Sequence, residues 1–205
     1  MRLGILGGSF DPVHLGHLLL AECCREAAQL DQVWLVPAAV PPHKQQQVLT
    51  ASRHRLEMLQ LAVAGHEALQ VSPLELDRGG VSYTVDTLQA VHAMQPAAEL
   101  FLLLGADALH DLPNWRDPAR ICQLALPVVV RRAGQPPPDL SILNGIVDPP
   151  RIAAIDQHQV RMPQIELSSS DLRERVRQGQ SIRYRTPRAV EKYIQTHGLY
   201  RDQER

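Results

Sequence analysis

The chain has 205 residues, with 21 lysines and arginines against 22 aspartates and glutamates, and a formal net charge of −1. A nearly neutral chain lacks the strong field that general binding to nucleic acid or to a membrane surface requires, so any anion site must be local. Hydrophobic residues make up 44% of the sequence, and a chain of this length buries roughly 70% of the surface that its unfolded form exposes. We therefore expect one domain over residues 1–205, with neither nucleic acid nor membrane as a partner.

The cysteines and the first residues of the sequence indicate the cellular compartment in which the protein is expected. Cys23, Cys24 and Cys122 are odd in number and lack the spacing of a metal site, and reduced thiols are typical of the cytoplasm. The first residues lead straight into an apolar run without the pattern of a signal peptide, and no apolar run approaches the ~20 residues of a membrane span. These features predict a cytoplasmic protein without a metal site of its own.

The first predicted strand covers residues 3–6 and is followed by a loop that opens with Gly7 and Gly8. Two adjacent glycines free the backbone for a sharp turn with exposed amides. A helical pattern begins at about Leu15 and continues through Ala28, and the N-terminus of a helix favours anions through its free amides and its dipole. The stretch therefore predicts a cradle for a phosphate chain.

Two histidines stand at the start of that helix. His14 and His17 are three residues apart, so they share a face, and Gly16 between them leaves room for a ligand close to the backbone. Taken alone, the pair is also compatible with surface histidines or with half of a metal site. The P-loop pattern and the dinucleotide-binding glycine pattern are both excluded, because neither follows the first strand.

Residues 33–36 form the second predicted strand, and the order strand, helix, strand predicts a parallel sheet with a right-handed crossover. Lys44 follows in a loop at the carboxyl end of that strand, where open α/β sheets bind ligands; it either closes over phosphates or is solvated. A structural helix is expected over residues 53–64 with Ser52 as its N-cap, then a weak strand over 69–71 and an irregular stretch from 73 to 76.

A third helical pattern begins near residue 85, with Ser82 or Thr84 as its cap and Tyr83 as a candidate for stacking on a ligand. The strongest strand, over residues 100–104, is wholly apolar and is expected beside the first strand. It ends in Gly105 and Asp107, where the carboxylate either reaches a ribose or a metal ion or caps the next helical turn. Trp115 is a second aromatic near that edge.

The last third of the chain predicts a strand over residues 124–130 that ends in Arg131 and Arg132, a pair that suits a phosphate but is commonly solvated. A proline-rich surface excursion covers 134–151, and a final strand covers 160–167. Ser168 opens a helix whose hydroxyls and amides, with Arg173 one turn on, form a second anion cradle or a simple cap. A last helix runs from Pro187 to Gly198. The C-terminal helical part, about 168–205, is expected to pack on the sheet edge, and the whole chain predicts a Rossmann-like, doubly wound α/β fold with a mostly parallel sheet.

The loop after the first strand carries the pattern Gly-Gly-x-Phe-Asp-Pro-x-His-x-Gly-His without a gap. It resembles the signature of the nucleotidyltransferases. The later motifs Pro-Pro-His-Lys, Ser-Tyr-Thr, Gly-Ala-Asp, Leu-Pro-Asn-Trp and Ser-Ser-Ser-Asp-Leu-Arg, in this order, resemble the bacterial nicotinate-nucleotide adenylyltransferases over almost the whole chain. Two positions depart from that family: Ser170 stands where threonine is usual, and Ala133 where proline is frequent.

The resemblance implies an enzyme that transfers an adenylyl group from ATP, as its Mg²⁺ complex, to nicotinate mononucleotide, giving nicotinate adenine dinucleotide and pyrophosphate in NAD biosynthesis. The substrate phosphate supplies the attacking oxygen, so the protein aligns the reactants and stabilises charge. The implied catalytic residues are His14, His17 and Arg173. The implied ATP and phosphate contacts are Gly7, Gly8, Ser9, Phe10, Gly16, Lys44, Gly105, Asp107, Ser169 and Ser170. The implied nicotinate mononucleotide contacts are Tyr83, Thr84, Trp115 and Arg132.

Two alternatives stay open at this point. One is another small nucleotidyltransferase, acting on nicotinamide mononucleotide or pantetheine phosphate or transferring a cytidylyl group. The other is a nucleotide-binding module without turnover. The motifs carry no information on oligomeric state.

Overall fold

The computed structural model describes residues 1–44, 46, 48–132, 134 and 136–201, with the side chains of Lys44 and Arg132 outside the described part. Within it, one sheet holds six strands in the order β3-β2-β1-β4-β5-β6. Their bounds are β1 Arg2–Gly8, β2 Gln32–Pro37, β3 Leu69–Val71, β4 Glu99–Gly105, β5 Leu126–Arg132 and β6 Val160–Met162. All five ladders are parallel. This is the strand order of the doubly wound Rossmann fold, which confirms the predicted fold class.

The sheet changes direction between β1 and β4. The chain moves outward in one direction through β2 and β3, then returns to place β4 beside β1, with Ile5 opposite Leu102. Ligands of open α/β sheets bind at such a switch point, outside the carboxyl ends of the strands. The segments that follow Gly8, Pro37 and Gly105 therefore meet where a ligand is expected.

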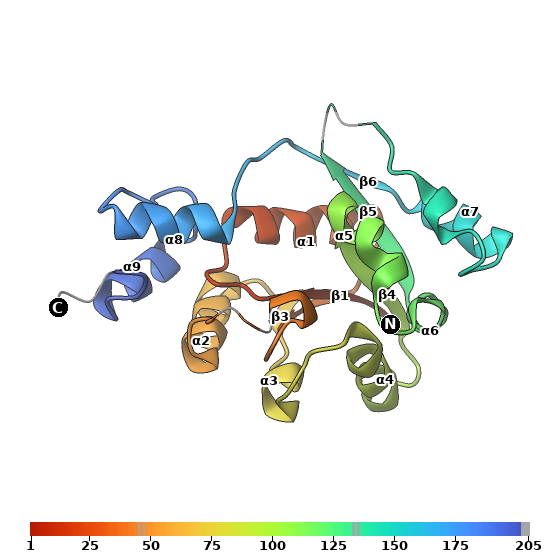
Figure 1. The fold of residues 1–205 in the computed structure, drawn as a ribbon, viewed down its shortest axis with the longest axis horizontal. Helices are drawn as coiled ribbons and strands as arrows, with labels where there is room; N and C mark the ends of the chain where they lie inside the picture. The colour runs from red at the N-terminus through yellow and green to blue at the C-terminus, as the bar shows by residue number, and fades with distance from the viewer. Residues whose placement is uncertain (45, 47, 133, 135, 202–205) are drawn as a thin grey trace.

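Helices cover both faces of the sheet, with α1 and α4 on opposite sides (Figure 1). The apolar residues of β1, β4 and β5 are almost wholly buried between them and form the core. Across the described residues, no helix is both long and apolar enough to cross a bilayer. The helices are α1 Leu15–Ala27, α2 Ser52–Val63, α3 Leu74–Arg78, α4 Thr84–Met94, α5 Ala106–Asp111, α6 Pro118–Leu124, α7 Pro149–Gln157, α8 Ser169–Arg177 and α9 Arg188–Thr196, with 3₁₀ turns η1 Pro42–Lys44, η2 Leu112–Asn114 and η3 Leu140–Leu143.

Two helices contradict the sequence-based expectations. The proline-rich excursion gives rise to α7, because Asp148 caps the helix by accepting a hydrogen bond from the Arg151 amide and Pro149 occupies its first turn. Proline is favoured there, since its missing N–H has no partner to lose. The stretch predicted to be irregular after residue 73 forms the short helix α3.

The last strand of the sheet is shorter than predicted. It ends at Met162, well before the predicted residue 167.

Two predicted caps are also wrong. Ser52 is the first residue of α2, and its N-cap is Ala51. The N-cap of α4 is Tyr83, without a side-chain cap from either Ser82 or Thr84. The Ser82 hydroxyl instead accepts a hydrogen bond from the Ala39 amide at 2.9 Å. Ser82 therefore joins two loops at the ligand edge of the sheet.

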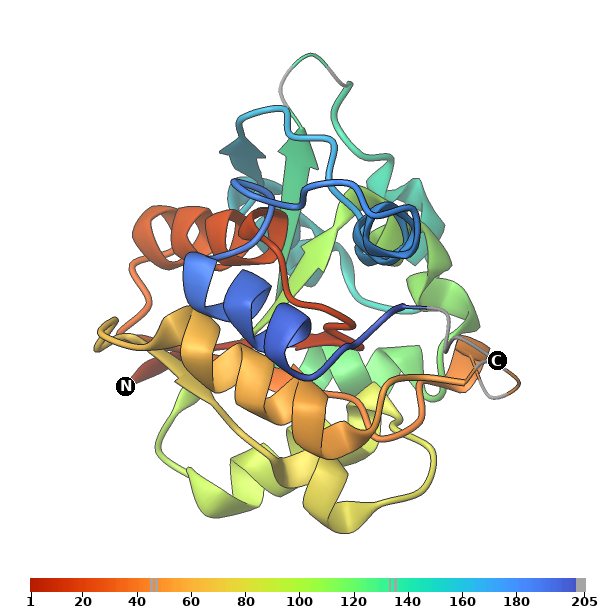
Figure 2. The same ribbon diagram turned by 90° about the vertical axis from the view of Figure 1, so that its left-hand side faces the viewer.

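The C-terminal helices do not pack on the sheet edge as predicted. Helix α9 lies against α2 (Figure 2), where the Tyr193 hydroxyl donates a hydrogen bond to the Glu57 carboxylate. Helix α8 reaches the loop between β1 and α1 with its N-terminus, as its place beside the start of α1 in Figure 1 suggests. The C-terminal segment therefore belongs to the surroundings of that loop.

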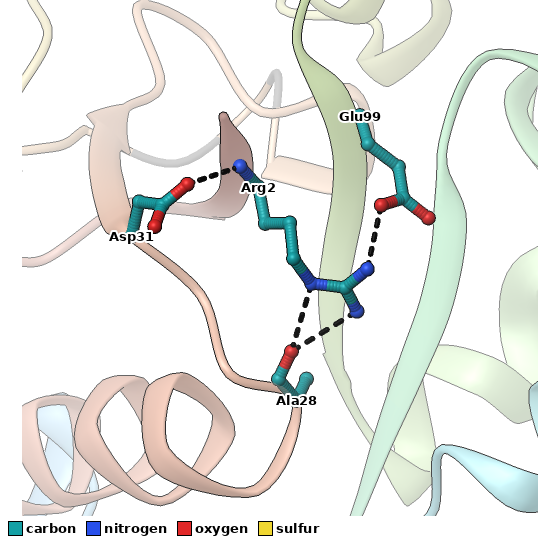
Figure 3. Close-up of polar contacts among 4 residues, drawn as sticks. All are labelled: Arg2, Ala28, Asp31 and Glu99. Carbon is teal, nitrogen blue, oxygen red and sulfur yellow. Dashed lines mark hydrogen bonds and ion pairs between the residues drawn. The ribbon is translucent and has the colours of Figure 1, made fainter.

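Arg2 ties the opposite, amino-terminal edge of the sheet together (Figure 3). Its amide donates to Asp31 at 2.6 Å, its guanidinium donates to the Ala28 carbonyl at 3.1 and 3.3 Å, and its Nη1 pairs with Glu99 at 2.6 Å. The guanidinium also lies 4.4 Å from the centre of the Phe101 ring. These contacts fasten the end of α1 and the start of β4 to β1, at the end away from the ligand edge.

Candidate active site

The β1–α1 loop, residues 9–14, leaves β1 at the ligand edge. The Gly8 carbonyl accepts a hydrogen bond from the Ala38 amide at 2.9 Å, which fixes the loop after β2 beside it. Phe10 is buried with φ of 48°, a left-handed conformation that is uncommon for a bulky residue. A Cβ at Gly8 would lie 3.1 Å from the Phe10 ring, so any larger residue here would require the ring to shift. The Phe10 ring is 1% exposed and is therefore inaccessible to a ligand.

His14 and His17 meet at the start of α1. Their rings stack with centroids 3.7 Å apart, and the His14 amide donates a hydrogen bond to Nδ1 of His17 at 3.2 Å. Since Nδ1 accepts, the neutral His17 ring carries its proton on Nε2. Phe10 supports His17 edge to face, at 4.9 Å between centroids. The two histidines therefore share a face, as their spacing predicts.

His14 is the more buried of the two. Only 6% of the residue is exposed, and Nδ1 has no hydrogen-bond partner. Burial lowers the pKa of His14 to about 4, because a charged ring is disfavoured away from water. A Cβ at Gly16 would lie 3.0 Å from this Nδ1. His14 is therefore neutral near pH 7, and Gly16 leaves the space that its ring occupies.

A buried arginine supports the loop from α2. Arg55 is 1% exposed and donates to the Ser9 carbonyl at 2.8 Å and to the Thr50 carbonyl at 3.0 Å. Burial lowers the pKa of its guanidinium, while the nearby Asp11 carboxylate opposes that shift. The sequence pattern predicts only a structural helix here, without a role in the site. The signal was present, since an arginine at the spacing of Met58 and Leu59 lies on the apolar face of the helix.

The N-terminus of α8 approaches the same loop from the other side. Ser169 donates from its hydroxyl to the Pro12 carbonyl at 2.8 Å. Arg173 donates from Nη1 to the Asp11 carbonyl at 2.7 Å and from Nη2 to the Ser170 hydroxyl at 3.2 Å. Ser168 caps the helix by accepting from the Asp171 amide. Ser169, Ser170 and Arg173, which lie far from the first loop in sequence, are thus brought together at it.

The loop before α4 lies on the β2 side of the site. The Ser82 hydroxyl accepts a hydrogen bond from the Ala39 amide, and the neighbouring Ala38 amide donates to the Gly8 carbonyl. These two bonds bring the loop that carries Tyr83 toward the glycine turn. The Arg116 guanidinium covers the Tyr83 ring at 4.8 Å and pairs with Asp86 at 3.3 Å. The half-buried Trp115 precedes Arg116 and Thr84 follows Tyr83. Tyr83, Thr84 and Trp115, which are predicted to contact nicotinate mononucleotide, therefore lie in one region of the structure.

The remaining predicted residues lie at the same edge. Gly105 ends β4 and is half-buried, and Asp107 is exposed in the first turn of α5. Lys44 ends η1 and Arg132 ends β5, but both side chains, like Ala133, lie outside the described residues. Among the residues that the structure describes, no group of three histidine, cysteine, aspartate or glutamate side chains could hold a metal ion.

The site therefore combines a glycine turn, the amides at the start of a helix, two stacked imidazoles and an arginine at a second helix. Exposed amides and fixed donors of this kind bind and stabilise the oxygens of a polyphosphate. A backbone cradle with two imidazoles and an arginine at a Rossmann switch point is the arrangement expected of a nucleotidyltransferase.

The comparisons with known proteins agree with this class. The family model described as cytidylyltransferase-like matches residues 5–175. A relative from Rhodopirellula baltica is 44% identical over 97% of this chain and 93% of its own length. One from Thermus thermophilus is 44% identical over 98% of this chain and 100% of its own. Both carry the name "Probable nicotinate-nucleotide adenylyltransferase". The chain belongs to the nicotinate-nucleotide adenylyltransferase family of cytidylyltransferase-like nucleotidyltransferases.

A solved structure shares the fold. The Plasmodium falciparum nicotinic acid mononucleotide adenylyltransferase, complexed with NaAD, superimposes with a TM-score of 0.73 at 18% identity and covers 97% of each chain. Agreement over nearly the whole length at so low an identity supports the fold, including the C-terminal helices.

Proposed function

We propose that this protein transfers the adenylyl group of ATP to nicotinate mononucleotide, giving nicotinate adenine dinucleotide and pyrophosphate, as a step of NAD biosynthesis. The observation that carries the proposal is the pair of stacked histidines at a helix N-terminus directly after a glycine turn. Relatives that cover nearly the whole chain carry the name of this activity.

In the reaction, an oxygen of the mononucleotide phosphate attacks the α-phosphorus of ATP. A new P–O bond forms, the bond to the bridging oxygen of the β-phosphate breaks, and pyrophosphate leaves with the electron pair. The attacking oxygen is already ionised, so no protein nucleophile or general base is required. The protein contributes alignment and stabilisation of the charge on the equatorial and leaving oxygens.

The loop residues divide this work. The backbone from Gly7 to Phe10 and Gly16 lies against the triphosphate, and His17 donates from Nε2, the nitrogen that carries its proton. His14 lies beside it, with its ring stacked on the His17 ring. Arg173, with Ser169 and Ser170 at the start of α8, binds phosphate oxygens after exchanging its contact with the Asp11 carbonyl. Gly105 and Asp107 lie toward the ribose, and Lys44 lies in the loop after β2.

Mg²⁺ enters as part of the Mg·ATP substrate. Mg²⁺ keeps several waters and is commonly held by substrate phosphates, with few protein ligands. The exposed Asp107 carboxylate at the ligand edge has the chemistry to contact one of its waters. No step requires a resident metal.

The mononucleotide occupies the region of Tyr83, Thr84 and Trp115, with its phosphate toward Arg132. The Arg116 guanidinium over Tyr83 places positive charge beside the aromatic ring. That charge favours a pyridine carboxylate over the neutral amide of nicotinamide mononucleotide. Residues 1–205 act as one unit, because Ser169 at the start of α8 and Thr186 before α9 donate hydrogen bonds to the β1–α1 loop. The three free thiols suit a cytoplasmic location.

The test is a set of rate measurements with Mg·ATP and each acceptor in turn: nicotinate mononucleotide, nicotinamide mononucleotide and pantetheine phosphate. We expect nicotinate mononucleotide to give the highest kcat/KM, with one pyrophosphate released per dinucleotide and no turnover in EDTA. A higher kcat/KM for either other acceptor would overturn the substrate assignment. ATP binding without pyrophosphate release from any acceptor would indicate a non-catalytic module.

A further inference from the structure

A buried carboxylate lies in the β1–α1 loop, and the proposed reaction does not use it. Asp11 is 2% exposed, three residues before His14. One carboxylate oxygen accepts a hydrogen bond from the Thr50 amide at 3.1 Å, and the other accepts from the Tyr200 hydroxyl at 2.6 Å. A buried carboxylate requires such donors, since an unpaired one costs several kcal/mol. With both oxygens held, the side chain cannot rotate.

Tyr200 reaches this carboxylate from near the C-terminal end of the described chain. Burial and the adjacent Asp11 carboxylate raise the pKa of the Tyr200 hydroxyl far above its usual value, so the hydroxyl remains a donor. The residue adopts φ of 63°, a left-handed conformation that is uncommon for tyrosine. A backbone held in this conformation indicates that the surrounding contacts fix where the ring points.

Other parts of the C-terminal segment contact the same loop through its backbone. Arg173 donates to the Asp11 carbonyl, and Thr186 donates from its hydroxyl to the Val13 carbonyl at 2.8 Å. The Arg185 carbonyl accepts from the Leu15 amide at 2.9 Å. These bonds fix the path of the backbone on both sides of His14. Tyr200 adds a hydrogen bond to a side chain of the loop, the Asp11 carboxylate.

We propose that Tyr200 is a positioning residue for adenylyl transfer, whose hydroxyl locks Asp11 and thereby fixes the loop that carries His14 and His17. The inference rests on the proposed function for its kinetic consequence, but its structural consequence is independent of any activity. If Tyr200 acts in this way, removing one oxygen atom near the C-terminus loosens the loop and slows the chemical step.

Tyr193 provides a matched control. It belongs to the same C-terminal segment, and its hydroxyl also donates to a carboxylate, that of Glu57 on α2. That bond docks α9 without contacting the β1–α1 loop. Tyr193→Phe therefore removes the same chemical group and weakens the attachment of the same segment, whereas only Tyr200→Phe releases Asp11.

The experiment compares the wild type with Tyr200→Phe, Tyr193→Phe, Asp11→Ala and the double variant Asp11→Ala/Tyr200→Phe. Amide hydrogen exchange over residues 11–17 is measured without substrates, and kcat and both KM values are measured with Mg·ATP and nicotinate mononucleotide. We expect Tyr200→Phe to speed exchange in the loop and to lower kcat about tenfold, because a small misplacement of catalytic groups has an effect of this order. The KM for the mononucleotide should stay unchanged.

Tyr193→Phe should leave loop exchange and kcat at wild-type values, even where its melting temperature falls as far as that of Tyr200→Phe. The double variant should lose no more activity than Asp11→Ala, because both changes break one interaction. Equal loop exchange in the two tyrosine variants would overturn the proposal, and so would additive losses in the double variant. If the wild type forms no dinucleotide, the proposed function fails while the exchange measurement still decides whether Tyr200 fixes the loop.

Discussion

The rings of His14 and His17 stack at 3.7 Å between centroids with an angle of 20° between their planes, and the His14 amide fixes the tautomer of His17. Contacts within the protein therefore orient the donor on His17 Nε2, and an oriented donor is the condition for strong electrostatic stabilisation of a transition state.

Replacing His17 with alanine should lower kcat by about 10²–10³, since it removes an oriented donor from the transition state. Steady-state kinetics with Mg·ATP and nicotinate mononucleotide measures the loss. His92→Ala, a change at an exposed histidine in the last turn of α4, should leave kcat unaltered. Near-normal turnover in His17→Ala would remove His17 from the catalytic residues.

Gly16→Ala should separate stability from activity. Alanine within a helix is favoured over glycine by roughly 0.5–1 kcal/mol, so folding should not suffer greatly. The new Cβ, however, would lie 3.0 Å from His14 Nδ1 and displace the ring. We expect kcat to fall about 10²-fold with a melting temperature near that of the wild type. A variant with wild-type kcat would show that the ring position is not critical.

His14 should make the protein less stable in mild acid. Its folded pKa of about 4 lies below the ordinary value of 6.5, so the unfolded chain binds the proton more readily. The free energy of unfolding should therefore fall as the pH drops from 6.5 to about 4, by about 3 kcal/mol from this group, and His14 should add nothing further below that range. Urea unfolding across this range should show a shallower pH dependence for His14→Gln. Parallel profiles for the two proteins would contradict the prediction.

Arg55 should be critical for folding. Arg55→Met removes the buried guanidinium that donates to the carbonyls of Ser9 and Thr50 and should cost roughly 3 kcal/mol. Arg53→Met, on the same helix, removes an exposed arginine 3.6 Å from Glu57 and should cost less than about 1 kcal/mol. Chemical denaturation of both variants gives the comparison, and equal losses would refute the role assigned to Arg55.

Arg116→Gln should weaken the preference for the acid over the amide. The guanidinium is largely exposed, so the expected effect is about 1 kcal/mol, or about fivefold in the ratio of kcat/KM for nicotinate and nicotinamide mononucleotides. Arg120→Gln, an exposed change on α6, should leave the ratio unchanged. An unaltered ratio in Arg116→Gln would assign the selectivity to other groups, such as backbone amides.

Most of the fold follows from local sequence patterns. The apolar runs of β1, β2 and β4 are long enough to be predicted as strands from the sequence alone. Their alternation with helices then predicts a parallel sheet. The missed helix α7 shows where such reasoning stops, because prolines that often break structure instead start a helix when an aspartate precedes them. The docking of α9 on α2 depends on contacts between distant segments, and no local pattern encodes it.

The residues of the site fall into the same two groups, those that a local pattern predicts and those that it does not. His14, His17 and the glycines lie close together in the sequence, so the motif predicts their role in the site. Arg55 and Tyr200 support that motif from two separate segments, and each is a common residue in an ordinary local context. Their roles become visible only once the fold places their polar atoms within hydrogen-bond distance and away from water.

A crystal structure of the complex with a non-hydrolysable ATP analogue and Mg²⁺ tests the central claim most directly. The account predicts triphosphate oxygens within hydrogen-bond distance of the amides that follow Gly8 and of His17 Nε2, with Arg173 turned toward the phosphates. An analogue bound elsewhere on the sheet edge, or a β1–α1 loop that makes no contact with its phosphates, would contradict the account.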